Sequence, residues 1–449
     1  MASRYIANTP HDQREMLRTI GVGALEDLLV RVPPRARLAR PLAVGDAVAE
    51  SDLIRELRAL AAENADADSH VCFLGAGAYD HYVPSPIDHL ISRGEFFTAY
   101  TPYQPEASQG TLRTIYEYQT MIAELTGMDV ANASIYDGAS SLAEAVLMAA
   151  AATERGEVVL ARGVNPLYRR VVATYCEGAG VRLREASGAD GVVDLDAIRK
   201  LVGGKSAALV VQSPNFYGCL EDLAAAAEIA HAAGALLVVV ADPVNLGLLE
   251  APGRLGADIV VGDGQGLGVP LSFGGPYLGV FAARQELVRR MPGRLVGATV
   301  DRDGRRGFVL TLQTREQHIR RAKATSNICT NVALCALMAT IYLATLGKEG
   351  LARVGELSAA KAHYAAERLC QVPGVSLRFT APFFKEFTLK LPKSPERVVA
   401  RLARQRILAG VPLKRFDRQL GDCLLVAVTE KRTRAEIDAF ADALGKAVA

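Results

Sequence analysis

The apolar residues between positions 66 and 330 form short continuous runs, separated by stretches with helical character. Four runs are predicted as strands: EVVLA from Glu157, AALVVQ from Ala207, ALLVVVA from Ala235 and DIVVG from Asp258. Predicted helices occur along the same part of the chain, among them Ser108 to Thr126, Ser140 to Thr153 and Glu221 to Ala233. Strands that are apolar throughout and linked by helices predict a mostly parallel sheet covered on both faces.

The chain on either side of this region has a different pattern. Residues 1–65 are predicted as a helical arm: Thr9 with Pro10 begins one helix, Ala24 to Val32 form a second, and Ser51 caps a third. Residues 331–449 begin with an apolar helix from Val332 to Leu346 and then mix strands (LRFTA, FTLKL, CLLVAV) with two helices. The N-cap pair Ser394-Pro395 and the capping box from Thr433 to Glu436 mark the starts of those two helices. The predicted domains are therefore an arm (1–65), a large α/β domain (66–330) and a smaller α+β domain (331–449).

Composition and motifs exclude several classes of protein. A net charge of +2 over 449 residues gives no footprint for nucleic acid or an anionic membrane. The apolar run from Val332 is shorter than the roughly 20 residues of a membrane span, so we expect a buried helix, and a cytoplasmic protein that contacts no membrane. The seven cysteines lack a CxxC pair, and the glycines of GDGQGLG do not match GxGxxG. A zinc site and a nicotinamide site therefore receive no support.

The alternating pattern resembles fold-type I enzymes that use pyridoxal phosphate (PLP), in the manner of aspartate aminotransferase. Such enzymes need a carboxylate to protonate the pyridine nitrogen, a helix N-terminus for the phosphate, and a lysine for the Schiff base. Asp242 follows the strand ALLVVVA at the expected sheet edge, although it could equally cap the turn through Pro243. Gly138 and Ser140 open a helix that could receive phosphate, or could belong to an ordinary N-cap.

The lysine is missing. After DIVV the chain reads GDGQGLG, with Gln265 and Gly266 where such enzymes present a His-Lys pair. No lysine lies between Lys205, at the amino edge of the sheet, and Lys323, beyond the strand and turn that supply the nucleophile. We therefore predict no catalytic residue and no covalent cofactor in this chain, with Gly266 in the lysine position and Asp242, Gly138 and Ser140 as remnants of the site.

Several long segments resemble one family, the glycine cleavage system P-protein in its two-chain form, and specifically its first subunit. They are RYIANTPHDQREMLRTIGV from Arg4, FFTAYTPYQPEASQGTLRTIYEYQTMIAELTGMDVANASIYDGASSLAEA from Phe96, ADPVNLGLLEAPGRLGADIVVGDGQGLGVPLSFGGPYLGVF from Ala241 and REQHIRRAKATSNICTN from Arg315. The resemblance implies that PLP is bound by a second subunit and that this chain carries a degenerate copy of the site. It also implies glycine as substrate of the complex, a lipoylated H protein as acceptor of the aminomethyl group, and an α2β2 assembly.

Fold-type I sites usually lie between two paired large domains, which suggests where this chain meets its partner. The segment YTPYQPEASQ is a candidate wall of the shared site, with the alternative of a buried loop with core tyrosines. A second candidate precedes the long helix, with a helix N-cap as the alternative. The interface candidates are Tyr100, Tyr103, Gln104, Glu106, Gln109, Ser326 and Asn327. Two other functions stay open: a regulatory protein on a degenerate fold, and a self-sufficient PLP enzyme that uses Lys323.

Overall fold

The structure is a computed structural model that describes residues 5–38, 40 and 42–449, and the chain divides into two units, one up to Asn64 and one from Ala65. The N-terminal unit contains α1 (Pro10–Ile20), the 3₁₀ turns η1 (Leu25–Leu29) and η2 (Pro34–Ala36), and α2 (Glu50–Ala61). Thr9 caps α1 in a capping box, as its sequence predicts. The second predicted helix is the 3₁₀ turn η1, and the prediction that Ser51 caps the third is wrong because α2 begins at Glu50 with Ala49 at the N-cap. No residue of these four elements is buried.

The second unit is built on a seven-stranded sheet in the order β2-β10-β9-β8-β7-β3-β4. The five strands from β4 to β9 pair in parallel, and β10 and β2 continue the sheet in antiparallel pairing. All four strands predicted from the apolar runs are present. The strands are β2 (Val130–Ala131), β3 (Glu157–Ala161), β4 (Arg182–Ala186), β7 (Ser206–Gln212), β8 (Leu236–Val240), β9 (Ile259–Asp263) and β10 (Gly279–Ala283).

Helices cover both faces of this sheet, which explains why its central strands have no polar side. The helices α6 (Gly138–Thr153) and α7 (Pro166–Ala179) pack together, as do α8 (Leu195–Leu201) and α9 (Leu223–Ala232), and both pairs contact the strands. The strands β3, β7 and β8 are buried over nearly their whole length. This is the mostly parallel, helix-covered sheet of fold-type I that the sequence predicts.

The C-terminal part forms a smaller α+β layer with its own apolar core. Its antiparallel sheet has the order β13-β14-β17-β16, built from β13 (Ser376–Leu377), β14 (Glu386–Lys390), β16 (Val411–Pro412) and β17 (Cys423–Ala427). The helices α12 (Pro395–Ala403) and α13 (Arg434–Val448) begin at the positions the sequence predicts. The strand β1 (Val71–Cys72) pairs with β15 (Ile407–Leu408) of this part, although the sequence boundary assigned residues 71 and 72 to the large domain.

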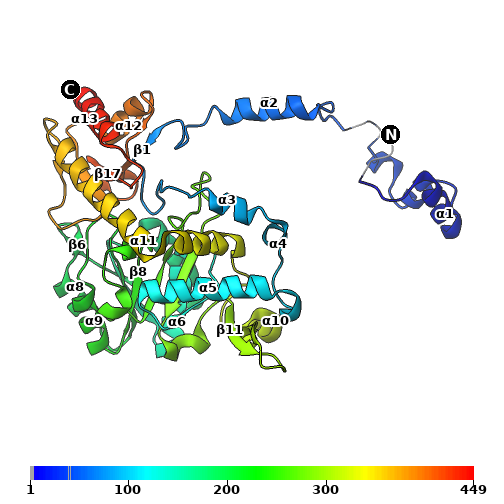
Figure 1. Ribbon diagram of the computed structural model, residues 1–449, viewed down its shortest axis with the longest axis horizontal. Helices are drawn as coiled ribbons and strands as arrows, with labels where there is room; N and C mark the ends of the chain where they lie inside the picture. Colours follow the sequence, from blue (N-terminus) through cyan, green and yellow to red (C-terminus); the bar gives the residue numbers. More distant parts are fainter. Residues whose placement is uncertain (1–4, 39, 41) are drawn as a thin grey trace. The chain divides into compact units, whose positions relative to one another are not determined.

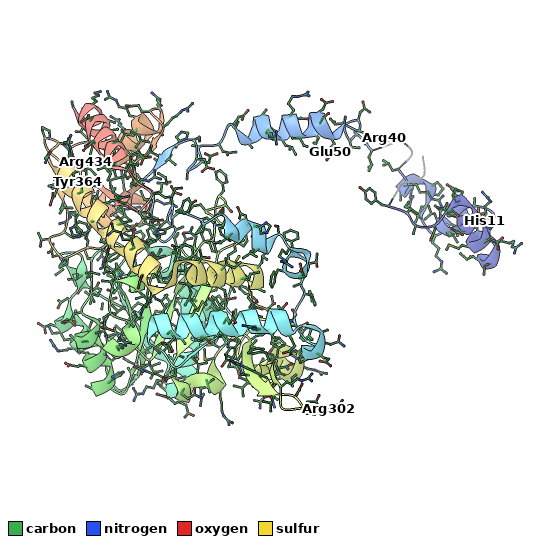
Figure 2. All side chains as sticks on the ribbon, viewed as in Figure 1. His11, Arg40, Glu50, Arg302, Tyr364 and Arg434 are labelled. Atoms are coloured by element: carbon green, nitrogen blue, oxygen red, sulfur yellow. The ribbon has the colours of Figure 1, made fainter. Side chains whose placement is uncertain are left out.

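A long helix, α11 (Ala333–Cys370), joins the two parts. Its first half lies beside α5 (Gln109–Thr126), and its second half contacts α13 (Figure 1). Tyr364 lies on this second half, and its hydroxyl accepts a 3.2 Å hydrogen bond from Nε of Arg434 at the start of α13 (Figure 2). The two halves meet at Gly347, where a positive φ of 59° breaks the regular helix.

The helix α11 is longer than the apolar run that predicts it, because the sequence beyond Gly347 is amphipathic rather than apolar. Among the described residues, α11 is the one helix long and apolar enough for a membrane span by length and composition. Its first half contributes Cys335, Ala336, Ala339 and Tyr342 to the main apolar core. The buried helix predicted for Val332 to Leu346 is therefore present, packed against protein.

Three further segments lie near α5. The short helices α3 (Pro86–Ile91) and α4 (Gly94–Phe97) precede it, and the hairpin of β11 (Leu295–Val300) and β12 (Arg306–Thr311) packs against it. Gln109, the first residue of α5, forms two hydrogen bonds with the backbone of Phe308 in β12: its Nε2 donates to the carbonyl oxygen and its Oε1 accepts from the amide, at 2.8 and 2.9 Å. Arg302 lies at the exposed tip of the hairpin (Figure 2).

Candidate functional site

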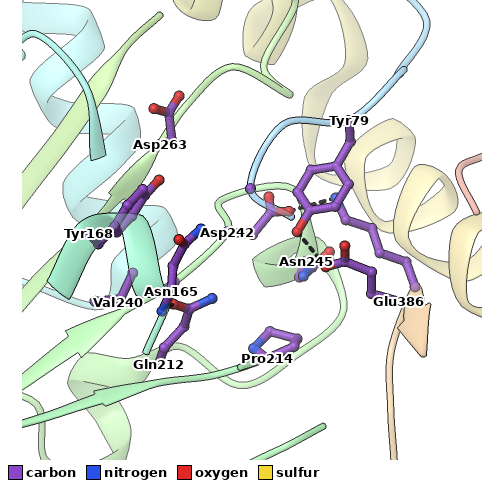
Figure 3. Close-up of a pocket in the computed structure, with 13 residues that line it drawn as sticks. Tyr79, Asn165, Tyr168, Gln212, Pro214, Val240, Asp242, Asn245, Asp263 and Glu386 are labelled. Carbon is purple, nitrogen blue, oxygen red and sulfur yellow. Dashed lines mark hydrogen bonds and ion pairs between the residues drawn. The ribbon is translucent and has the colours of Figure 1, made fainter. Parts of the chain in front are cut away.

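Polar side chains gather where the parallel strands of the large sheet end. They line a cavity of ≈ 40 Å³ between the two parts of the second unit, which is room for a few water molecules and far less than the roughly 300 Å³ of a typical ligand pocket (Figure 3). The residues around it come from the ends of β7, β8 and β9, from the loop after β1 and from the start of β14: Gly77, Tyr79, Asn165, Tyr168, Gln212, Pro214, Val240, Ala241, Asp242, Asn245, Asp263, Lys385 and Glu386.

Asp242 stands at the centre of this edge. Its Oδ1 accepts a hydrogen bond from the amide of Val244 at 3.0 Å, which is the turn-capping role that the sequence left open. Its Oδ2 lies 2.6 Å from Nζ of Lys385 in an ion pair, so the same carboxylate also faces the cavity (Figure 3). Asp242 therefore caps the turn and, with its other oxygen, pairs with Lys385 at the predicted edge of the sheet.

The lysine in this pair was missed by the sequence analysis, which searched only the large domain. Lys385 comes from the residue before β14, and its side chain is 2% exposed. A signal was present in the sequence: the charged pair Lys385-Glu386 interrupts the apolar stretch FFKEF, where a solvated surface strand would alternate. Neighbouring Glu386 is buried, and burial raises the pKa of its carboxyl to about 7 against the lowering effect of hydrogen bonds from Ala76 and Tyr79.

The N-terminus of α6 is occupied by carboxylates of the chain itself. Asp137 caps the helix by accepting from the amide of Ser140 at 2.8 Å, and Asp263 accepts from the amide of Gly138 at 3.0 Å. Burial raises the pKa of Asp263 to about 7. The helix N-terminus at Gly138 and Ser140 is therefore an N-cap whose amides already have acceptors.

Gly266 lies just after β9, with its backbone surrounded by other residues. A Cβ atom on it would come 2.8 Å from Cγ2 of Val244 and 3.0 Å from Cδ2 of His81. The preceding Gln265 is buried and accepts from the amide of Tyr79 at 2.8 Å. The space beside Gly266 is thus occupied by Val244 and by the loop that carries Tyr79 and His81.

The candidate wall YTPYQPEASQ is partly exposed to solvent and partly packed against other residues. Tyr100 is 84% exposed, and Tyr103 is 49% exposed, so these are not core tyrosines. The ring of Tyr103 lies 5.4 Å from the guanidinium of Arg294, which also donates to Thr330 at 2.8 Å. Gln104 is the N-cap of the turn η3 (Pro105–Ala107), Glu106 lies inside this turn, and both are exposed. Tyr103 and Thr330 share Arg294, which links residues 100–109 to the segment that precedes α11.

The second interface candidate does not cap the long helix. The side chain of Ser326 accepts from the amide of Ile328 at 2.9 Å, and Asn327 accepts from Gln317 at 2.8 Å. The N-cap of α11 is Val332, so the N-cap interpretation of Ser326-Asn327 is wrong. Lys323 is exposed in the 3₁₀ turn η8 (Arg321–Lys323) and does not line the cavity.

Comparison with known proteins defines the family. Residues 3–444 match the family model described as glycine cleavage system P-protein. The chain belongs to the glycine cleavage system P-protein family. It is 53% identical over 440 residues to a protein of Chloroherpeton thalassium named probable glycine dehydrogenase (decarboxylating) subunit 1, covering 98% of this chain and 99% of that protein. The Moorella thermoacetica protein of the same name is 54% identical, with 98% of both chains covered.

A solved P-protein structure is similar over nearly the whole chain. The crystal structure of glycine decarboxylase (P-protein) of the glycine cleavage system, in an inhibitor-bound form, has a TM-score of 0.92 and 49% identity, and the match covers 99% of this chain and all of that one. The fold extends to more distant enzymes, such as glutamate decarboxylase of Lactobacillus brevis at a TM-score of 0.69 and 15% identity. The predicted fold class and the predicted P-protein family are both confirmed.

Proposed function

We propose that this chain is the PLP-free subunit of a two-subunit glycine decarboxylase. In this proposal a second subunit of the same fold binds PLP and glycine, and a lipoylated H protein accepts the aminomethyl group. The observation that carries the proposal is the state of the three positions that a coenzyme needs. Gly266 offers no amine, two carboxylates hold the amides at the start of α6, and Asp242 is already paired with Lys385 beside a cavity of ≈ 40 Å³.

The negative charges at the start of α6 disfavour PLP as strongly as the small size of the cavity does. A phosphate binds a helix N-terminus through free amides and the positive end of the helix dipole. Here Asp137 and Asp263 have taken the amides of Ser140 and Gly138, and an ionised Asp263 would repel a phosphate dianion at this place. The residues present therefore do not fit PLP, and no step of the reaction is assigned to this chain's own side chains.

The need for a partner is supported by names and by surface. The two relatives described above are named as subunit 1, which implies a further subunit in their complexes. Beside the candidate wall, an apolar cavity of ≈ 250 Å³ lies between α4, α5 and the start of α11, lined in part by Phe97, Tyr100 and Leu337. Phe97 is 67% exposed, and exposed aromatic groups of this kind mark protein contacts. An α2β2 assembly with an interface above ~2,000 Å² is what we expect of such an obligate pair.

The decisive experiment compares the chain alone with the chain in its complex. Purified alone with PLP, it should show no internal-aldimine absorption and no adduct trapped by borohydride, and it should release no carbon dioxide from glycine. Decarboxylation should appear when the PLP-bearing chain and lipoylated H protein are added, together with a heavier species in analytical ultracentrifugation. A stoichiometric pyridoxyl-lysine in this chain, at Lys323 or elsewhere, would contradict the proposal. A partner chain that is fully active without this one would leave it a regulatory role.

A further inference from the structure

Lys385 connects the two parts of the second unit through a buried charge. Its backbone immediately precedes β14 in the small sheet, whereas its ammonium lies at the carboxyl edge of the large sheet, 2.6 Å from Oδ2 of Asp242. A lysine buried to 98% is rare in proteins unless its charge is paired. The ion pair therefore ties the two parts of the chain together, because either residue alone would leave a buried charge uncompensated.

The surroundings of the ammonium are those of a cation site. Nε2 of His81 lies 2.8 Å from Nζ, and the ring of Tyr79 lies with its centroid 3.8 Å away, close enough for a cation–π contact. Because an ammonium only donates hydrogen bonds, Nε2 of His81 must carry the lone pair and Nδ1 the hydrogen. That Nδ1 then donates to Glu430 at 2.6 Å. Carboxylate, imidazole lone pair and aromatic face all favour a positive charge at this point.

The same point has a defined occupant in enzymes of this fold. There the carboxylate that follows the equivalent strand holds the pyridine nitrogen of PLP protonated, so that it faces a cationic N–H group. Lys385 likewise places a positive charge against Asp242, at an ion-pair distance of 2.6 Å. The site is closed from the other side, since His81, which contacts Lys385, also fills the space beside Gly266.

We propose that Lys385 is a built-in substitute for the coenzyme's ring nitrogen, a permanent cationic partner of Asp242 that holds the small part of this chain against the large sheet. The inference rests on the proposed function, because a chain that took up PLP at Asp242 would have to displace Lys385. It goes further by assigning a positioning role to a residue that no sequence motif marks. In this way the chain holds its small part against the large sheet with its own side chain.

Chemical rescue tests this assignment in the full-length chain. Lys385→Ala removes the ammonium and leaves a cavity beside Asp242, so we expect its Tm to fall by roughly 5 °C or more. Ethylammonium chloride should then raise the Tm of Lys385→Ala in a saturable manner, relative to sodium chloride at equal ionic strength, because a ligand that binds only the folded state stabilises it. The wild-type chain, whose site is already filled, should show no such saturable increase.

The matched control is Lys390→Ala. Lys390 lies on the same strand, β14, and its side chain is 57% exposed, with Nζ 3.7 Å from Asp422. Loss of an exposed pair of this kind should change the Tm by about 1 °C or less, without rescue by ethylammonium. If Lys385→Ala does not fold, the double variant Asp242→Asn/Lys385→Met still decides. It carries no unpaired buried charge, and its Tm should exceed that of Asp242→Asn and that of Lys385→Met.

Three outcomes would overturn the inference: a Lys385→Ala variant as stable as wild type, a response to ethylammonium equal in wild type, Lys385→Ala and Lys390→Ala, or a double variant less stable than both single variants. These failures differ from failure of the proposed function, which would appear as a PLP adduct on the wild-type chain. A wild-type chain free of PLP whose Lys385 is dispensable would contradict only the substitute role.

Discussion

Asp263 is the residue of the candidate site whose protonation we expect to change with the solution pH. Its carboxylate accepts from the amides of Gly138 and Gln265, each at 3.0 Å, while burial raises its pKa to about 7. In the unfolded chain an aspartate has a pKa near 3.9, so between about pH 4 and pH 7 the folded state binds a proton that the unfolded state does not. The stability from this group is complete below about pH 4 and is lost as the pH rises to 7.

We therefore expect the free energy of unfolding of the wild-type chain to decrease between pH 5 and pH 8 more than that of Asp263→Asn. The limit is about 1.4 kcal/mol for each pH unit inside the window. The asparagine keeps one acceptor oxygen and places an NH₂ group where the carboxyl has its second oxygen, so the variant should start about 1 kcal/mol less stable at pH 5. Urea unfolding of both chains at the two pH values measures the difference. Parallel pH profiles would mean that Asp263 does not change its protonation on folding.

Gly266 gives a steric prediction at the same edge. Its φ is not positive, so alanine fits the backbone, and the cost of Gly266→Ala should come from Val244 and His81 at 2.8 and 3.0 Å from the new Cβ. We expect a loss of about 1–3 kcal/mol. The control, Gly445→Ala in α13, has open space around its Cβ and should gain about 0.5–1 kcal/mol. Gly266→Lys should not form a borohydride-stable PLP adduct, because the space is taken; a stoichiometric adduct would contradict the closed site.

Among individual residues, the sequence identified those whose position follows from a strand end. Asp242 and Gly266 lie at the edge of the large sheet as predicted, because β8 and β9 are apolar runs that leave no doubt about where they stop. Lys385, His81 and Glu430 were not foreseen, since they come from three separate stretches of chain and meet only after the small part packs on the large one. No periodicity encodes such a meeting.

At the scale of elements, continuous runs of apolar residues predicted the strands well. The pattern of polar residues predicted the ends of the helices less well. The central strands are buried on both faces, so burial alone defines them. The end of α11 was missed because its apolar face narrows beyond Gly347, where the helix continues along the small part. Ser51 failed as a cap because α2 begins one residue earlier, with Ala49 in the extended conformation. Local sequence limits a helix end only when no neighbouring element decides it.

The wall segment before α5 yields a prediction of its own. Tyr103 packs its ring near Arg294 and accepts a 3.3 Å hydrogen bond from it, while half of its side chain is exposed. If residues 100–109 complete the partner's site, Tyr103→Ala should weaken pairing or glycine turnover in the reconstituted complex and leave the fold of this chain intact. Tyr103→Phe keeps the ring and should retain most of the pairing. Sedimentation and turnover measure the two effects, and normal behaviour of Tyr103→Ala would remove this segment from the proposed wall.

At the scale of the whole molecule, the two units predict independent folding of the larger one. No side chain of α1, η1, η2 or α2 is buried, and all four apolar clusters found among the described residues lie within residues 65–449. A chain that begins at Ala65 should therefore keep its Tm within about 2 °C of the full-length chain, since it retains every residue of these clusters. Thermal unfolding followed by circular dichroism tests this, and a large fall in Tm would show that the arm stabilises the second unit.

The carboxylates at the N-terminus of α6 also affect how such a chain can evolve. To regain a phosphate at Gly138, it would have to lose Asp263; to regain a lysine at position 266, it would have to move His81; and to free Asp242, it would have to replace Lys385. Each change alone strands a buried charge, exposes an unmet amide or forces a clash, so each intermediate is less stable than the starting chain. If the chain is the PLP-free subunit that we propose, every single step towards a coenzyme-binding site therefore costs stability, and the chain stays dependent on its partner.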